Sequence, residues 1–156
     1  LILQGCNNGG DYMDSSNVRK IREESDLVFL EYSKFIDSNK KKLVRICDWL
    51  NSKEGYFHMY IRNGEINDLK TMKGKEYENH DNITILSNIL VENNFSGVHR
   101  GSSAGSDITF FRHKINSKKE PKYISHELIY VKDGKDVNSS WEKIEGNFYY
   151  MCAVGE

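Results

Sequence analysis

Histidines and arginines stand next to one another in the second half of the chain, in combinations that suit acid–base chemistry on phosphate. An imidazole with a pKa of about 6.5 can accept or donate a proton near neutral pH, and a guanidinium can stabilise an anionic phosphorane. Three of the five histidines fall on predicted strands in the second half of the chain, two of them beside an arginine. One hypothesis is therefore a metal-free phosphodiesterase or ribonuclease that uses His99, His113, His126, Arg100 and Arg112.

Other catalytic and metal-binding signatures are missing from the sequence. There is no Gly-x-Ser-x-Gly, no His-Glu-x-x-His, no Walker loop and no Cys-x-x-Cys. Isolated histidines on strands are more often exposed to solvent or held by a hydrogen bond. We therefore expect a protein that is not an enzyme and that holds neither a metal nor a cofactor.

Aromatic side chains on the predicted strands suggest binding instead. Alternation along a strand turns about half of these rings away from the core, where Tyr and Trp make good anchors for a protein partner. A formal charge of -1 gives no reason to expect nucleic acid. The binding candidates are Tyr56, Tyr60, Phe111, Tyr130, Trp141 and Tyr149.

Two segments of the chain have the apolar spacing of amphipathic helices. Over residues 18–53 apolar residues recur at steps of three and four. This segment is either one long helix or two helices divided at Ser38-Asn39, and the division into two helices is favoured. A second helix is predicted over 83–94. Both segments must bury one face against the rest of the domain.

The remaining elements read as strands. They are expected over 56–61, 97–100, 108–115, 123–131, 141–144 and 147–154, and residues 65–82 are expected to lack regular structure. Helices first and strands afterwards predict one α+β domain over 18–156. Its N-terminal helices should pack on one face of an antiparallel, mostly meander sheet.

The first residues resemble a bacterial lipobox. Leu3-Gln4-Gly5-Cys6 is similar to Leu-x-Gly-Cys, which in bacterial lipoproteins is cut before the cysteine that carries the lipid. The resemblance implies that residues 1–17 are a signal-peptide remnant and a flexible tether. It also implies a lipid anchor on Cys6 and a place in the cell envelope, periplasmic or at the outer surface.

The three cysteines are consistent with that resemblance. If Cys6 carries lipid, Cys47 and Cys152 remain as an even pair in an oxidising compartment, where they either form a disulfide or stay as buried thiols. A bridge would close a loop of about a hundred residues and could stabilise by about 4–5 kcal/mol.

The end of the chain looks like the last hairpin of small toxin-immunity-type lipoproteins. The resemblance covers residues 127–134 and 141–150. It implies a membrane-anchored binding protein that neutralises a toxin by surface complementarity, with the toxin or an envelope protein as partner. The alternatives are the histidine-dependent phosphodiesterase and a ligand-binding lipoprotein of another specificity.

Overall fold

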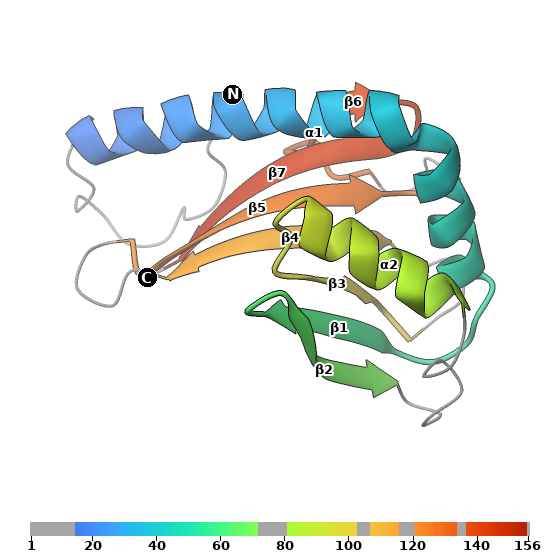
Figure 1. The fold of residues 1–156 in the computed structure, drawn as a ribbon. Coiled ribbons are helices and arrows are strands. Elements are labelled where there is room, and N and C mark those ends of the chain that lie inside the picture. Colours follow the sequence, from blue (N-terminus) through green and yellow to red (C-terminus); the bar gives the residue numbers. More distant parts are fainter. Residues whose placement is uncertain (1–14, 72–80, 103–106, 116–120, 134–136, 156) are drawn as a thin grey trace.

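The structure is a computed structural model that describes residues 15–71, 81–102, 107–115, 121–133 and 137–155. Two helices pack on one antiparallel sheet of seven strands, so the predicted α+β class is confirmed (Figure 1). Across the sheet the strand order is β2-β1-β3-β4-β5-β7-β6. The strands are β1 (Phe57–Arg62), β2 (Glu65–Thr71), β3 (Gly97–Arg100), β4 (Ile108–Ile115), β5 (Tyr123–Tyr130), β6 (Glu142–Glu145) and β7 (Phe148–Gly155).

Helix α1 (Ser15–Asn51) is one continuous helix, so the expected division into two helices is wrong. The Asn39 side chain does not end the helix, because it donates a hydrogen bond to the Phe35 carbonyl one turn back, at 3.0 Å. Figure 1 shows α1 running along β7 and then bending, so that both parts cover the same sheet. The predicted tether over residues 7–17 lies outside the described residues up to residue 14, and Ser15 already belongs to α1.

Helix α2 (Asp81–Glu92) confirms the second predicted helix. The helix is capped two residues beyond its end by Asn94, whose φ of 56° is left-handed, and the Phe95 amide donates a hydrogen bond to the Leu90 carbonyl at 2.9 Å. This is the hydrogen-bond pattern of a Schellman cap. The cap turns the chain directly into β3.

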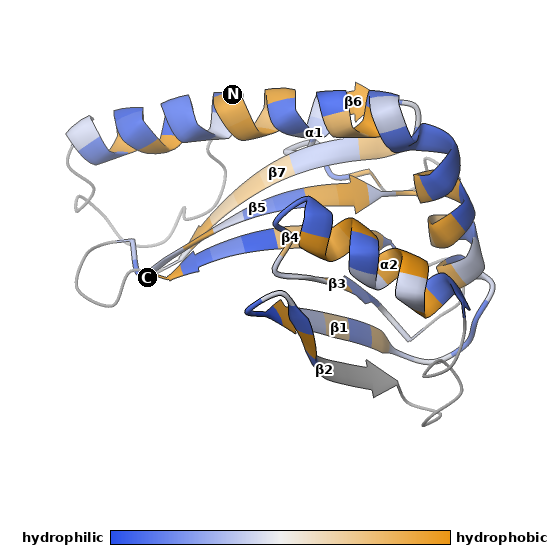
Figure 2. Cartoon of the chain, viewed as in Figure 1, coloured by the Kyte–Doolittle hydropathy of each residue, from blue (hydrophilic) through white to orange (hydrophobic). Residues whose placement is uncertain are grey.

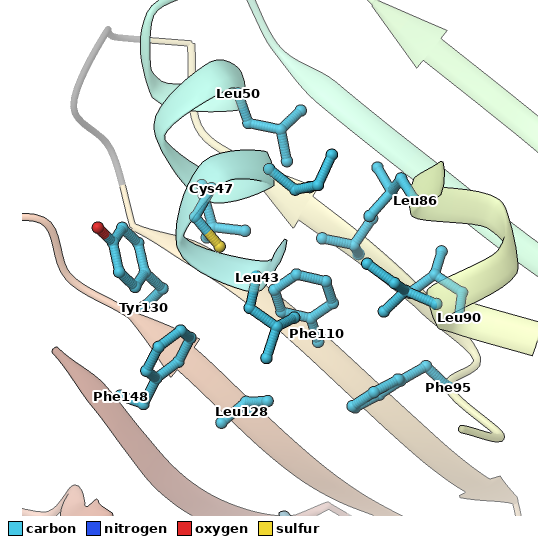
Figure 3. Packing of buried hydrophobic residues seen from close by; sticks show 14 of the residues in the cluster. Leu43, Cys47, Leu50, Leu86, Leu90, Phe95, Phe110, Leu128, Tyr130 and Phe148 are labelled. Carbon is cyan, nitrogen blue, oxygen red and sulfur yellow. The ribbon is translucent and has the colours of Figure 1, made fainter. Parts of the chain in front are cut away.

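The main core lies between the sheet and the two helices. Figure 3 shows Leu43, Cys47 and Leu50 of α1 and Leu86 and Leu90 of α2 meeting above the strands. Along both helices apolar and polar residues alternate as the predicted spacing requires (Figure 2). From the sheet, this core includes Phe57, Met59, Val98, Ile108, Phe110, Leu128, Tyr130, Phe148 and Tyr150.

Strand β2 overturns the expectation that residues 65–82 lack regular structure. Asn63 and Gly64 have φ values of 54° and 78°, as a tight type I′ hairpin turn requires, and residues 65–71 then pair with β1. Because β2 is an edge strand, hydrogen bonds to one neighbour are enough to form it. Its polar sequence therefore lacks the alternation by which the other strands were recognised. Residues 72–80 lie outside the described part of the chain.

Candidate functional site

The two faces of the sheet divide the predicted catalytic residues. Strand pairing places His99 opposite Thr109 and Arg112 opposite His126, and side chains alternate between faces along each strand. His99 and His113 therefore lie on the face away from the helices. Arg100, Arg112 and His126 lie on the helix-covered face, so the five residues do not share one cleft.

His126 is held in a buried polar network beneath α1. Its Nδ1 lies 2.9 Å from the Tyr150 hydroxyl, and its Nε2 lies 3.7 Å from Glu24 Oε1. Burial lowers the pKa of His126, and the nearby Glu24 carboxylate opposes that shift without cancelling it. These contacts give the imidazole a structural role.

Arg112 joins three elements on the helix-covered face. It donates hydrogen bonds to Glu31 of α1 at 2.6 Å and to the Asn93 carbonyl after α2 at 2.9 Å. Its guanidinium carbon lies 4.9 Å from the centre of the Tyr32 ring and 5.4 Å from that of Phe95. Arg100, the other predicted arginine, is fully buried and donates to the Gly55 carbonyl at 2.5 Å.

On the face away from the helices, three imidazoles surround one phenyl ring. We call the five residues His58, Tyr60, His99, Phe111 and His113 the histidine–aromatic cluster. The Phe111 ring centre lies 4.4 Å from that of His113, 5.6 Å from His99 and 6.4 Å from His58. Phe111 itself is only 2% exposed, so it forms the floor of the cluster, and its neighbours form the surface.

Gly97 makes this arrangement possible. It lies directly opposite Phe111 across β3 and β4. A Cβ at Gly97 would lie 2.5 Å from the Met59 carbonyl oxygen and 2.7 Å from the Phe111 ring. Because the side chain is absent, the ring can lie against the backbone of β3.

His58 and His99 face each other across β1 and β3. They are register partners, and their ring centres lie 6.4 Å apart at an angle of 41°. The Tyr56 hydroxyl lies 2.5 Å from His58 Nδ1, and the Tyr60 ring centre lies 4.0 Å from that of His58. Both imidazoles are half-buried, and the register places Lys70 of β2 beside His58.

The surroundings of His99 and His113 favour their neutral forms. Burial lowers the pKa of His99, and His58 and His113 lower it further, since two positive charges so close together repel each other. Burial also lowers the pKa of His113. His99 and His113 are therefore uncharged at neutral pH and available as proton acceptors.

The structure separates the predicted binding residues. Tyr130 lies in the main core, with its hydroxyl 3.2 Å from Asp48 Oδ1, so it cannot meet a partner. Phe111 and Tyr149 lie on the face away from the helices but are themselves buried. Tyr56, Tyr60 and Trp141 remain half-buried.

Two exposed residues were missed by sequence reasoning. Ile115 is 80% exposed and Tyr123 is 40% exposed, and they are register partners where β4 ends and β5 begins. We call this pair the exposed hairpin end. The alternation of side chains along residues 108–115 could have revealed Ile115, because it puts Ile115 on the same face of the sheet as Phe111 and His113.

The two described cysteines add no further candidate site. Cys47 and Cys152 are free thiols, so the possible disulfide is not formed. Cys47 lies in the main core, whereas Cys152 pairs with His126 beneath the first turns of α1, close to Ser25. Ser25 precedes Cys47 by about six helical turns. Cys6 lies outside the described residues.

Among the described residues, no group of three His, Cys, Asp or Glu side chains could hold a metal ion. None of the helices described is long and apolar enough to cross a membrane.

No protein-family model, curated protein or solved structure matches the chain.

Proposed function

We propose that this chain is a lipid-anchored binding protein of the cell envelope, of the immunity or inhibitor type, which neutralises a toxin by covering part of its surface. The exposed hairpin end is the observation that carries this proposal. Ile115 and Tyr123 present a large aliphatic and a large aromatic side chain side by side. Such a pair is typical of the anchors at the centre of a protein interface.

The Tyr123 ring is held in place before any partner binds. A Cβ at Gly155 would lie 1.8 Å from Tyr123 Cε1, so the ring rests on backbone that carries no side chain. His113 approaches it edge-on, with ring centres 6.3 Å apart. An anchor that is already ordered loses little conformational entropy on binding.

The anchor to the membrane is proposed from the lipobox-like Leu3-Gln4-Gly5-Cys6. A domain tethered through Cys6 would meet an incoming toxin at the membrane surface. Intact-mass measurement of the native protein tests this part. A diacylglyceryl group on Cys6 is the expected result, and an unmodified Cys6 thiol in the native protein contradicts it.

A photo-reactive residue at position 123 tests the binding surface in cells that naturally make the protein. Crosslinking to one envelope or toxin protein is expected from position 123 and not from position 30. Leu30 is a matched control, because it is 54% exposed but lies on α1. Equal labelling from both positions, or none from position 123, contradicts the proposal.

The crosslinked protein then allows a direct measurement of affinity and protection. I115D should weaken binding at least about tenfold, because it places a charge on a side chain that loses its contact with water when the partner binds. L30D introduces the same charge on α1 and should leave the Kd unchanged. In a killing assay the wild type and L30D should protect cells, and I115D should not.

A further inference from the structure

We infer that two copies of this chain associate through the outer face of α1, as an antiparallel pair of helices centred on Leu27 and Leu30. This interaction surface is separate from the exposed hairpin end and does not rest on the proposed function. Leu27 is 63% exposed and Leu30 is 54% exposed, although both are large aliphatic side chains. They lie one turn apart on the same side of α1, so they form one apolar contact point.

The residues around these leucines have the spacing of a helix–helix contact. Alternating steps of three and four along α1 define one row, which we call the α1 seam: Lys20, Glu23, Leu27, Leu30, Lys34, Asp37 and Lys41. Such steps keep side chains on a stripe that can face a second helix along its length. Every member of the seam is exposed.

The α1 seam is turned away from the sheet. Successive residues of a helix are rotated by about 100°, which places the seam opposite the buried residues of α1, such as Ser25 and Tyr32. In Figure 1 the first part of α1 lies at the outside of the molecule, with the sheet on its inner side. A second helix can therefore reach the seam without displacing any part of the core.

The charges of the seam decide the direction of the second helix. An antiparallel pair with its two-fold axis between residues 27 and 30 places the leucines of one copy against those of the other. Glu23 then meets Lys34 of the second copy, and Lys20 meets Asp37, so opposite charges flank the leucines on both sides. In a parallel pair each of these charges would meet the same residue of the other copy and be repelled. The seam therefore fits a second copy of itself in one direction only.

Two acidic residues beside the seam are already neutralised within each chain. Glu24 lies 3.5 Å from Lys114, and Glu31 lies 2.6 Å from Arg112. Both cations belong to β4, so these carboxylates are drawn toward the sheet and away from a second helix. Their repulsion across the antiparallel pair is correspondingly small.

The association should be of moderate strength. Glu23 forms an ion pair with Arg19 at 2.9 Å, but both side chains are largely exposed, so this pair contributes little and leaves Glu23 available to Lys34 of the second copy. Only two leucines from each copy form the apolar centre, which is less than an obligate dimer buries. We expect a Kd of about 1–100 μM.

This pairing leaves the exposed hairpin end uncovered in both copies. Ile115 and Tyr123 lie on the face of the sheet away from the helices, whereas the α1 seam lies on the helix side. The dimer would thus present two separate binding surfaces. L30D should break the dimer and still leave the Kd of each binding surface unchanged.

Sedimentation velocity of the purified full chain at low salt tests the pairing. From about 1 to about 300 μM the wild type should shift from monomer to dimer and not to larger species. E23K and K34E should each weaken the dimer about tenfold, because each places like charges against one another in two symmetric layers. The double variant E23K/K34E should restore the dimer, since both pairs form again with their signs exchanged. E65K makes the same change of charge on β2 and should leave the Kd of the dimer unchanged.

Restoration in the double variant separates the pairing from a folding defect, because two misfolded variants would not rescue each other. A photo-reactive residue at position 30 should crosslink to a second copy of this chain, giving a species of twice its mass, and not to the protein captured from position 123. The inference is overturned by a wild type that stays monomeric at about 300 μM, by single variants that dimerise as the wild type does, or by a double variant as weak as the single ones. A crosslink from position 30 to any other protein also overturns it, whatever position 123 captures.

Discussion

At the scale of single residues, Gly97 explains why an aromatic cluster exists on a face that neither helix covers. The Phe111 ring occupies the space that a side chain at Gly97 would need. Burying the phenyl ring in this way removes apolar surface from water without a covering helix. The imidazoles and Tyr60 are then held around its edge.

G97A should therefore be destabilising. The new methyl group would clash with the Met59 carbonyl and with Phe111, and relief requires strands β1, β3 and β4 to separate slightly. We expect a loss of about 1–3 kcal/mol in the free energy of unfolding, measured by urea denaturation. An unchanged unfolding midpoint would show that the ring moves aside freely.

The neutral imidazoles make stability depend on pH. Well above pH 6.5, the ordinary pKa of an imidazole, His99 is uncharged in both the folded and the unfolded chain. As the pH falls below that value, His99 becomes protonated in the unfolded chain but stays neutral in the folded chain, because folding lowers the pKa of His99. The free energy of unfolding therefore falls. The loss stops once the pH passes the pKa of folded His99.

H99Q should reduce this dependence. Glutamine does not titrate, so urea denaturation should give a smaller fall in stability between about pH 7 and about pH 5 than in the wild type. His113 and His126, whose pKa values are also lowered, keep the remaining slope in the same direction. A steeper fall in H99Q would contradict the assignment.

At the scale of elements, Arg112 of β4 connects α1 to the end of α2. Its partner Glu31 is 60% exposed in its side chain, so that ion pair contributes little. The bond to the Asn93 carbonyl and the position over the Tyr32 and Phe95 rings are better shielded from water. These contacts fix where the two helices cross the sheet.

R112A should lower the free energy of unfolding by about 2 kcal/mol, since it removes charged hydrogen bonds and a cation over two rings. E31A is the matched comparison and should cost less than about 1 kcal/mol. R112K keeps the charge but not the guanidinium fork, so its stability should lie between R112A and the wild type. Equal losses in R112A and E31A, measured by denaturation, would assign the stability to the ion pair.

The same scale shows how far the sequence could predict the fold. Elements that bury an apolar face, such as α2, β4 and β5, were predicted to within a few residues, because burial leaves a periodic pattern. Strand β2 was missed, since an edge strand needs only backbone pairing. The division of α1 at Ser38-Asn39 was predicted because these residues are typical of helix ends, whereas here the Asn39 side chain donates a hydrogen bond within the helix.

Predictions about the site were limited by strand register. Alternation alone assigns His99 and His113 to one face only if the pairing of β3 with β4 is known, and the same holds for His126. His58 entered no catalytic hypothesis, because its partner His99 lies 41 positions later in the sequence. Contacts between distant segments of this kind leave no local pattern to read.

At the scale of the whole molecule, the described part of the chain is stable without a disulfide. Cys47 is buried and Cys152 is half-buried, and burial raises the pKa of both thiols. The core between the helices and the sheet is therefore the main source of stability. This holds whether or not the compartment is oxidising.

Reductant should accordingly leave thermal unfolding unchanged. A thiol reagent should label Cys47 and Cys152 more slowly in the folded protein than in denaturant, because thiolates are rare at a raised pKa. Labelling of Cys47 should be the slower of the two, since Cys47 is buried and Cys152 is half-buried. Mass spectrometry of labelled peptides reads each site separately. A lower unfolding midpoint on reduction would reveal a bridge.

The position of β7 has a consequence for how the chain is made. β7 is the last described strand, yet it lies inside the sheet between β5 and β6. While a ribosome is still synthesising residues 148–155, one side of β5 has no neighbour to satisfy its backbone groups. The sheet can therefore close only after residues 148–155 have been synthesised, and until then the free edge of β5 can pair with other chains.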